Sequence, residues 1–430
     1  MSTPRLDRDP RPLTAGTAAA RRTLPILLAL ALGTFAIGSG EFGSNGIVQL
    51  FARDFAVSVP EATWAITTYA LGVVIGSPIL TILAARLNRR TLLLGLVGLF
   101  LVGNLASAAA TDLGMLTAAR FVTGTVQGAY FGAGAVVAAH AYGPGREGKA
   151  FATVMAGLTA ATIVGSPLGT YLGQRVGWQS LYLVVAVIGL AAGAAILARV
   201  PRSPALDGGP IVHELIALRR PMVWATIGVA ALGISSIFAV YTFIGPYITD
   251  AARADESLIP VALAVFGVGM ATGNWVGGRL ADRYPYRGLV IGYGAVLGIL
   301  ALIALAGEHL LVLLPALFGV GATMMMAIPT IQVLLSGYGP QAPTLMGALN
   351  LASLNLANAL GAVGGALALS LGWGALSTAW AGLALTAAGL ILFALTVVRH
   401  PPVAIGRQRP AARDPAPRDP APPNRQGEQQ

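Results

Sequence analysis

Two residues of opposite charge stand inside apolar runs of the sequence, and their types allow proton chemistry. Glu41 lies in the segment FAIGSGEFGSNG, residues 35–46, and Arg120 lies in another apolar run. A charge at the centre of a bilayer costs roughly 2.5–3.5 kcal/mol, so such a residue persists where it faces a cavity or a partner. Burial favours a protonated carboxyl, whereas a nearby guanidinium favours the carboxylate. A carboxyl that alternated between these surroundings would load and release a proton.

The two charges are predicted to lie at similar depth. If the first run ends near residue 50, a rise of about 1.5 Å per helical residue puts Glu41 roughly 13 Å below that end. Arg120 then lies roughly 10 Å below the start of its own run near residue 113. We therefore expect the two to approach each other in at least one conformational state. A permanent Glu41–Arg120 clamp, which only holds two helices together, is the simpler alternative.

The composition predicts a polytopic helical membrane protein. The 430-residue chain is 55% hydrophobic and 10% charged, whereas a soluble chain has about 25% charged residues. Its apolar blocks match the roughly 20 residues needed to cross the hydrocarbon layer, where the backbone must bond within a helix. The twelve predicted spans are residues 23–50, 62–85, 91–110, 113–140, 149–174, 179–199, 222–248, 257–281, 288–306, 309–337, 343–370 and 374–398.

The positive residues indicate an orientation. Of the 27 Lys and Arg residues, all but Arg53, Arg120, Arg175 and Arg253 fall in the two tails and in alternate loops. Because cytoplasmic loops carry the excess of positive charge, both termini are predicted to be cytoplasmic. The net charge of +10 then reflects topology, and we expect no nucleic-acid partner.

The longest internal connection, residues 200–221, divides the spans into two groups of six. Shifting the chain by about 197 residues places ARFVTG, residues 119–124, on ALFGVG, residues 316–321, and two further segments match in the same order. A duplicated unit of this kind predicts a cavity near mid-bilayer, between the halves. The predicted parts are a tail at 1–22, a bundle at 23–199, a linker with a short amphipathic helix at 200–221, a bundle at 222–398 and a disordered tail at 399–430.

No constellation for an enzyme is found. The chain has no Cys, and its four His residues lie scattered at span ends or in loops. Neither metal-ligand spacing nor a phosphate-binding Gly-Lys loop occurs. We expect no catalytic residue, no metal and no cofactor.

Several motifs resemble the major facilitator superfamily over residues 23–398. The chain is similar to its twelve-span drug:proton antiporters, in particular the arabinose-efflux-like and chloramphenicol-efflux-like branch. The loop pattern Gly-x-x-x-Asp-Arg-x-Gly-Arg-Arg is degraded in the first half, where Thr81 and Ala85 replace its Gly and Asp, and is better kept in the second. The resemblance is carried by the GSGEF segment at 38–42 and by Arg86, Asn88, Arg89, Arg90, Arg120, Gly124, Gly128, Gly157, Gly165, Pro167, Gly169, Gly278, Asp282, Arg283 and Arg287.

The resemblance implies roles for two sets of these residues. Loop residues Arg86, Arg89, Arg90, Asp282, Arg283 and Arg287 would gate the inner mouth through contacts with neighbouring helix ends. Simple positive-inside anchoring is the alternative for the arginines. Gly157, Gly165, Pro167 and Gly169 would form a hinge in the fifth span, or serve plain helix packing.

Polar and aromatic residues inside the other spans are candidates to line the cavity. Asn355 and Asn358 share one helix face, and they either bind a ligand or bond neighbouring helices. The full set of candidates is Phe42, Tyr69, Gln127, Tyr241, Thr242, Asn274, Gln332, Asn355 and Asn358. The second half has Leu317 where the first has Arg120, so proton coupling is predicted in the first half.

These observations predict an all-α membrane protein with twelve transmembrane helices in two pseudo-symmetric six-helix bundles around a central cavity. The predicted function is efflux of a small drug-like or amphipathic molecule by proton antiport and alternating access. The predicted location of the transporter is the inner membrane. Export of a sugar, nucleoside or other metabolite is the alternative, and uptake by symport is a third possibility. The expected partners are the substrate, protons and the bilayer, and the expected state is a monomer.

Overall fold

The computed structural model describes residues 14–84, 86–143, 147–207, 214–284, 286–340 and 342–400, and every regular element in these residues is a helix. The all-α class predicted from the composition is therefore confirmed for this part of the chain. Most of the predicted N-terminal tail and residues 401–430 of the predicted C-terminal tail lie outside the described residues.

The first group of helices precedes the linker, and π-helical turns interrupt two of its spans. These elements are α1 (Thr14–Gly46), α2 (Val48–Asp54), α3 (Val59–Ala62), α4 (Trp64–Leu71), η1 (Gly72–Gly76), α5 (Ser77–Leu83), α6 (Arg89–Ala108), α7 (Leu113–Tyr142), α8 (Glu147–Ala160), η2 (Ala161–Gly165), α9 (Ser166–Val176) and α10 (Gln179–Arg199).

The second group follows the linker, and short breaks divide two of its spans. These elements are α11 (Pro221–Tyr241), α12 (Ile244–Pro246), η5 (Tyr247–Ala251), η6 (Glu256–Leu258), α13 (Ile259–Arg283), α14 (Arg287–Ala306), α15 (Leu310–Met325), α16 (Ile328–Tyr338), α17 (Pro343–Ser370) and α18 (Ser377–Leu395). In the linker, the predicted amphipathic helix is a 3-10 helix, η4 (Glu214–Arg219), after a 3-10 turn, η3 (Pro204–Leu206).

Local sequence signals set many of these helix ends. Proline occupies the first turn of α11, α13, α16 and α17, where its missing N–H is not needed. The Asp112 side chain caps α7 by accepting a hydrogen bond of 2.8 Å from the Met115 amide. Gly177 has a φ of 110° between α9 and α10, a conformation that favours glycine and permits the tight turn there.

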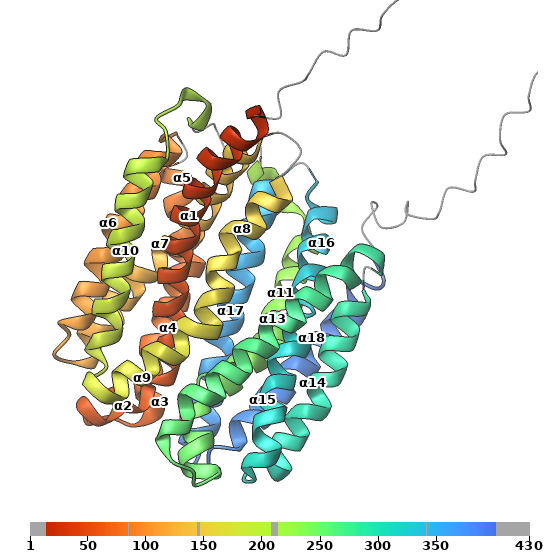
Figure 1. Ribbon diagram of the computed structural model, residues 1–430. Helices are drawn as coiled ribbons and strands as arrows, with labels where there is room; N and C mark the ends of the chain where they lie inside the picture. Colours follow the sequence, from red (N-terminus) through yellow and green to blue (C-terminus); the bar gives the residue numbers. More distant parts are fainter. Residues whose placement is uncertain are drawn as a thin grey trace, which may run out of the picture.

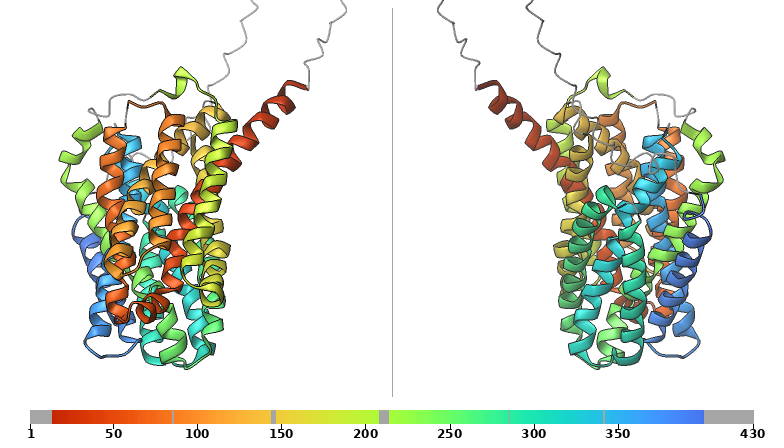
Figure 2. Two further views of the ribbon diagram at one scale, coloured as in Figure 1. Left: turned by 90° about the vertical axis from the view of Figure 1, so that its left-hand side faces the viewer. Right: turned by 90° about the vertical axis from the view of Figure 1, so that its right-hand side faces the viewer.

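The long helices run side by side as a bundle, with the start of α1 projecting beyond one end (Figures 1 and 2). We call this end, where α1 starts and α18 finishes, the tail end; α2, α3 and α9 lie at the opposite end. Buried apolar side chains form one cluster within residues 27–206 and another within residues 217–397 that also takes in Phe42. These clusters support the division into two halves proposed from the sequence.

The two halves meet along two helix pairs. The span made of α8, η2 and α9 packs against α13 through η2 and α9, and α17 packs against α4 and η1. The α8 and α5 segments, at the tail-end side of the same spans, make little contact with the other half. The halves are thus in closer contact toward the end opposite the tails.

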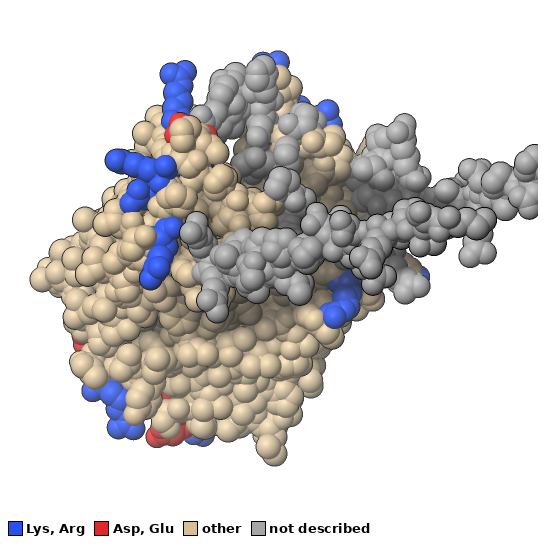
Figure 3. Space-filling view, turned by 45° about the horizontal axis from the view of Figure 1, so that its top comes forward, with Lys and Arg blue, Asp and Glu red and all other residues tan. Residues whose placement is uncertain are grey.

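Eleven of the helical segments in the described residues are long and apolar enough to cross a membrane. The remaining predicted span, built from α8, η2 and α9, is a continuous helical segment that is not among them. Figure 3 shows Lys and Arg side chains around the rim of the tail end, above a broad surface that carries no charged residues in this view. Such an uncharged belt is what a hydrocarbon layer requires.

Candidate functional site

Glu41 lies deep inside the first half, on α1. Its side chain is 4% exposed, and Gln127 of α7 donates a hydrogen bond of 2.8 Å from Nε2 to its Oε2. Glycines before and after it allow α1 to approach its neighbours closely: a Cβ at Gly38 would meet Leu158 and Ala161 of the fifth span. The small residues around Glu41 therefore let α1 pack closely against the fifth span beside the buried carboxyl, whereas larger side chains would hold these helices apart.

Arg120 occupies the same region from α7. Its guanidinium carbon lies 4.2 Å from the ring centroid of Tyr69 and 5.4 Å from that of Tyr182, and Nη2 donates to the Gly40 carbonyl at 3.2 Å. The faces of aromatic rings attract a guanidinium electrostatically, and more strongly where water is excluded. The Arg120 guanidinium is therefore held against the backbone of Gly40, the residue that precedes Glu41 in the chain.

The structure brings Glu41 and Arg120 into one cluster without pairing them directly. The ion pairs in the described part of the chain are Arg53–Glu256 and His309–Glu308. Arg120 instead donates to the carbonyl of Gly40, the residue before Glu41. In this conformation Gln127 binds the Glu41 carboxyl. The direct contact between Glu41 and Arg120 that the sequence predicts would require another conformational state.

Buried polar atoms around this cluster lack hydrogen-bond partners among the described residues. They include the Tyr69 hydroxyl, Gln127 Oε1, and Nε and Nη1 of Arg120. In the second half, Asn355 Oδ1 and both amide atoms of Asn358 are also unpaired. A buried polar group without a partner costs about 1–3 kcal/mol, so these atoms are suited to bind water or polar groups of a ligand.

Asn355 lies on a side of α17 that faces the first half. Leu351 and Ala352, one helical turn before Asn355, line an opening shared with Val73 and Gly128 of the first half. Because residues three and four apart share a helix face, Asn355 continues this surface toward α4. Tyr69 lies on α4, so the unpaired Tyr69 hydroxyl and Asn355 Oδ1 belong to two helices that pack against each other across the halves.

Other cavity candidates hold the halves together. Phe42 and Tyr241 make an edge-to-face contact with ring centroids 5.9 Å apart, and the Tyr241 hydroxyl lies 2.7 Å from Ser166 Oγ. The Thr242 hydroxyl donates to Asn45 Oδ1 at 3.0 Å. Asn45, one helical turn after Glu41, was not among the predicted cavity residues, although it stands in the same polar segment.

Asn274 and Gln332 differ from these residues. Asn274 is exposed, on the face of α13 that also carries Gly267, whose position contacts Thr162 of the first half. Gln332 is partly buried and accepts a hydrogen bond of 2.9 Å from Asn350 Nδ2, while its own Nε2 donates to Ser336. In this conformation Gln332 is therefore bonded within the second half.

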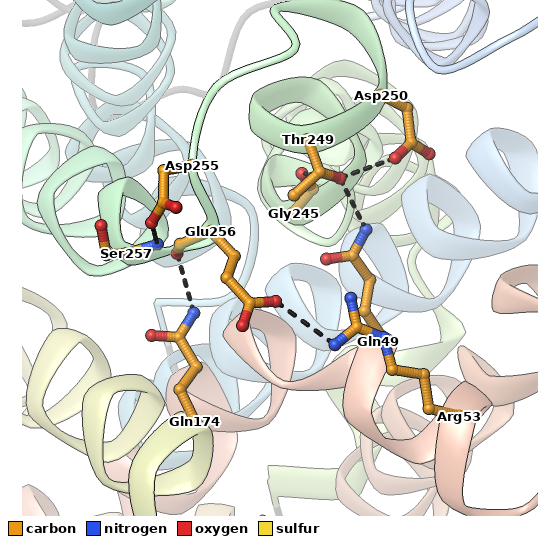
Figure 4. A network of polar contacts seen from close by, with 9 residues as sticks. All are labelled: Gln49, Arg53, Gln174, Gly245, Thr249, Asp250, Asp255, Glu256 and Ser257. Carbon is orange, nitrogen blue, oxygen red and sulfur yellow. Dashed lines mark hydrogen bonds and ion pairs between the residues drawn. The ribbon is translucent and has the colours of Figure 1, made fainter.

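A polar network closes the end opposite the tails (Figure 4). Gln49 Nε2 donates to Thr249 Oγ1 at 3.0 Å, Arg53 Nη1 lies 3.3 Å from Glu256 Oε2, and Gln174 Nε2 donates to the Glu256 carbonyl at 2.9 Å. Each of these three bonds joins the two halves, and we call the five residues the latch. None was predicted from the sequence, because a contact across halves depends on the conformational state.

A neighbouring acid adds negative charge beside the latch. Hydrogen bonds from the Ser257 side chain and backbone lower the pKa of the Asp255 carboxyl, and Arg175 adds to this effect. The Asp255 carboxyl therefore remains charged near neutral pH, next to Glu256.

We expect Glu256→Gln to loosen the latch only slightly. The Arg53 and Glu256 side chains are 61% and 46% exposed, and ion pairs of this kind contribute about 0–1 kcal/mol. The bond from Gln174 to the backbone carbonyl survives the substitution. Leu263→Cys, buried behind the latch near Gly46, reports opening through its rate of maleimide labelling. We expect at most about a fivefold increase; a much larger one would show that the ion pair dominates the closure.

Two of the loop arginines, Arg90 and Arg287, contact their own half. Arg90 Nη2 donates to the Leu197 carbonyl at 2.7 Å, and Arg287 lies over the Tyr284 ring at 4.0 Å. Arg86 is exposed and Arg89 is partly buried. The side chains of Asp282 and Arg283 lie outside the described residues, so their predicted gating role stays a prediction.

The predicted hinge glycines lie where the fifth span packs closely against α1 and α10. A Cβ at Gly157 would meet the Ala31 carbonyl and the Thr34 hydroxyl, and one at Gly165 would meet Ser39. Gly169 is similarly close to Leu181. Pro167 stands in the first turn of α9, directly after the π-helical turn η2. Both predicted roles, packing and bending, are compatible with this geometry.

Comparison with known proteins gives a consistent result. The family described as Major Facilitator Superfamily matches residues 30–362 and 246–424. Inner membrane transport protein YdhP of Escherichia coli (strain K12) is 34% identical over 349 residues, which cover 81% of this chain and 90% of that protein. Putative transporter AraJ of the same organism is 33% identical, with coverage of 81% and 88%. Chloramphenicol resistance protein of Streptomyces lividans is 32% identical, with coverage of 80% and 89%.

A solved structure shares the fold. It is a bacterial homolog of the human lysosomal transporter Spinster, in an inward-facing and occupied conformation. The TM-score is 0.70 at 14% identity, and the match covers 90% of this chain and 98% of that one.

Proposed function

The chain belongs to the major facilitator superfamily and is a membrane transporter, not an enzyme, and from this premise we propose that it exports a small molecule in exchange for protons. The observation that carries the proposal is the buried Glu41 carboxyl, bonded to Gln127 and lying beside the Arg120 guanidinium. An acid and a base in an apolar interior have an energetic cost, which a role in proton transfer would explain.

The proposed cycle moves the proton by changing the surroundings of Glu41. In the present conformation Gln127 donates to the carboxyl, an interaction that suits a carboxylate or a protonated acid. A shift of α1 against α7 within the first half that brings Arg120 closer to Glu41 favours the charged form and releases the proton. Movement away from Arg120 favours protonation. Coupling follows if substrate binds preferentially to the deprotonated form.

We propose that the tail end faces the cytoplasm. The Lys and Arg residues around its rim support this orientation through the positive-inside rule (Figure 3). The latch then lies on the outer side, and its three bonds between halves keep that side closed. On this assignment the structure corresponds to an inward-facing state.

The substrate is proposed to be a small drug-like or amphipathic molecule. The similarity to a chloramphenicol resistance protein supports a substrate of this class. Phe42 and Tyr241, whose rings are in contact across the halves, and Tyr69 would supply aromatic contacts to it. Export of a more polar metabolite is the second candidate. The unpaired Oδ1 of Asn355 and the unpaired amide of Asn358 favour it, because together they offer a donor and two acceptors to a hydroxyl-bearing ligand.

The test uses the purified chain in proteoliposomes with an imposed pH gradient. Chloramphenicol and a neutral sugar serve as probes, and each is followed in both directions across the membrane. The proposal expects at least one probe to move against its concentration gradient as protons move the opposite way. Probe movement in the same direction as protons would overturn antiport and indicate uptake.

A further inference from the structure

Asn88, in the loop before α6, connects three segments of the first half. Its Nδ2 donates to the Ser203 carbonyl at 2.9 Å and to Asp207 Oδ1 at 2.8 Å, and both partners belong to the linker. Its Oδ1 accepts from the Arg90 amide at 3.1 Å and so caps α6. Arg90 Nη2 in turn donates to the Leu197 carbonyl of α10 at 2.7 Å. The start of the linker and the end of α10 are therefore held beside the start of α6.

This arrangement gathers arginines from two parts of the chain. One set lies in the loop before α6 and in its first turn, and the other lies at the end of α10 and in the linker. Each member stands a few residues at most from a bond made by Asn88 or Arg90. Figure 3 shows Lys and Arg side chains grouped at the upper left, on the side where Figure 1 places α6 and α10. We call the set the basic patch, and its members are Arg86, Arg89, Arg90, Arg199 and Arg202.

The positive charge of the basic patch has little compensation in the part of the chain that the structure describes. The ion pairs there are formed by Arg53 and His309, neither of which belongs to the patch. A nearby acid, Asp207, already accepts from Asn88. Arg90 Nε is buried and has no hydrogen-bond partner among the described residues. The exposed members are Arg86, Arg199 and Arg202. An anion can therefore approach the patch without breaking an ion pair first.

Arginines at the same end of the second half are held differently. The Arg279 guanidinium carbon lies 3.5 Å from the Trp275 ring centroid, and that of Arg287 lies 4.0 Å from the Tyr284 ring centroid. Such stacking attracts a cation to the face of an aromatic ring. The patch arginines make no ring contact of this kind within the described residues. The two halves thus offer an unstacked and a stacked set of cations at one end of the bundle.

Next to the patch, the outer face of α6 carries two glycines. Gly95 and Gly98 are exposed, and a Cβ at either position would meet no atom within 4 Å. Thr91 and Val102 are exposed too, and they share this face because each stands four residues from a glycine. We call these four residues the glycine strip. Since small residues let another apolar group approach the helix backbone closely, the strip offers a narrow seat for an apolar chain.

The patch and the strip lie at different depths. Arg89–Ala108 and Gln179–Arg199 are each long and apolar enough to cross a membrane. These two segments pack side by side as α6 and α10 (Figure 1). The patch stands at the ends of both, where the hydrocarbon layer meets the headgroups, and the strip stands within the apolar length of α6. Together they match the two chemical parts of one lipid molecule.

The charge of the patch favours an anionic lipid. Guanidinium groups donate charge-assisted hydrogen bonds to phosphate oxygens, and clusters of Lys or Arg at the end of a transmembrane helix are typical of sites for anionic headgroups. A zwitterionic headgroup would bring a further cation to a place already rich in them. Positive-inside anchoring explains charge in a loop, but it does not explain the open glycines beside it.

We propose that the basic patch and the glycine strip bind one anionic phospholipid. Its phosphate contacts arginines from both sets, and one of its acyl chains lies along Gly95 and Gly98. A phosphate between the two sets would also hold the start of the linker on the first half, where Asn88 already binds it. This inference concerns the bilayer alone, so it stands or falls independently of proton antiport.

The test measures lipid binding to the purified chain in a neutral detergent by native mass spectrometry. Phosphatidylglycerol and phosphatidylcholine with identical oleoyl chains are titrated separately, so the two probes differ only in their headgroups. We expect the first phosphatidylglycerol to bind at least about tenfold more tightly. Equal affinities would overturn the proposal. Inorganic phosphate at the concentration of the lipid should leave phosphatidylglycerol bound, and its displacement would show a site for the free anion instead.

Paired arginine variants test whether the patch is the site. Arg199→Gln with Arg202→Gln removes two exposed cations that make none of the hydrogen bonds described above. We expect affinity for phosphatidylglycerol to fall roughly 25-fold, or about fivefold for each arginine, and affinity for phosphatidylcholine to stay the same. Arg279→Gln with Arg287→Gln removes as many cations from the same end of the second half. An equal loss in this control would show a general attraction to that end and would contradict a site.

A second pair of variants tests the strip. Gly95→Leu with Gly98→Leu covers it, and the open space around both positions lets the fold accept the new side chains. We expect both lipids to bind about fivefold more weakly, because the acyl chain loses close contacts while the headgroup keeps its own. Gly294→Leu with Gly298→Leu, on α14, fills positions that are equally open and should change neither affinity. Unchanged binding in the α6 variant, at an unchanged thermal midpoint, would refute the proposed seat for the acyl chain.

Discussion

Glu41→Gln is expected to stop gradient-driven export while leaving downhill exchange of substrate intact. Glutamine keeps the shape of the side chain and can still bond Gln127, whose Nε2 now donates to Glu41 Oε2 at 2.8 Å. It takes up no proton, so movement of the halves is no longer linked to proton transfer. In proteoliposomes, accumulation of the probe should fall to the level measured without a pH gradient, and exchange of labelled for unlabelled probe should continue.

Glu308→Gln provides the matched control for loss of a carboxylate. Glu308 is 65% exposed and contacts His309 near the start of α15, outside the buried cluster. Its substitution should leave both gradient-driven export and exchange unchanged. If Glu41→Gln retained full gradient-driven export, Glu41 would be a structural acid that holds α1 against α7 through its bond to Gln127.

The cluster of Glu41 and Arg120 could be anticipated because few variables determine it. The bilayer sets where apolar helices end, and a rise of about 1.5 Å per residue converts sequence position into depth. The structure places Arg120 against the carbonyl of Gly40, next to the acid. The partner that holds the carboxyl, Gln127, was assigned to the substrate cavity, since side-chain direction within a span does not follow from depth.

The positions of the spans were also predictable, but their internal structure was less so. The span predicted at 343–370 coincides with α17, and that at 179–199 coincides with α10. The π-helical turns and the breaks after Tyr241 and Met325 were not predicted. Hydropathy is insensitive to them, because a proline, a glycine or a wide turn changes backbone bonding without changing the apolar character of the segment.

The latch could not be predicted for a different reason. Gln49, Thr249 and Glu256 lie near span ends, where polar residues normally face solvent, and no spacing rule connects residues about 200 positions apart. Their pairing exists only when the two halves close at that end. Sequence patterns report what each span contains, whereas contacts of this kind report which conformational state is populated.

Arg120→Ala is expected to abolish proton coupling and to destabilise the fold, the second of the two largest effects. The substitution removes the charge beside Glu41 and the stacking on Tyr69 at 4.2 Å, a contact worth about 2 kcal/mol when water is excluded. It also leaves a cavity between Tyr69 and Tyr182. We expect gradient-driven export to fall to background and the thermal midpoint of the purified protein to drop.

Arg120→Lys separates the charge from the geometry. Lysine keeps the positive charge, but its ammonium has no planar face to stack on Tyr69 and reaches the Gly40 carbonyl less well. Residual gradient-driven export with a lower thermal midpoint would show that the charge serves coupling while the stacking serves stability. Loss of export as complete as in Arg120→Ala, at unchanged stability, would instead show that coupling needs the guanidinium in its present position between the two rings.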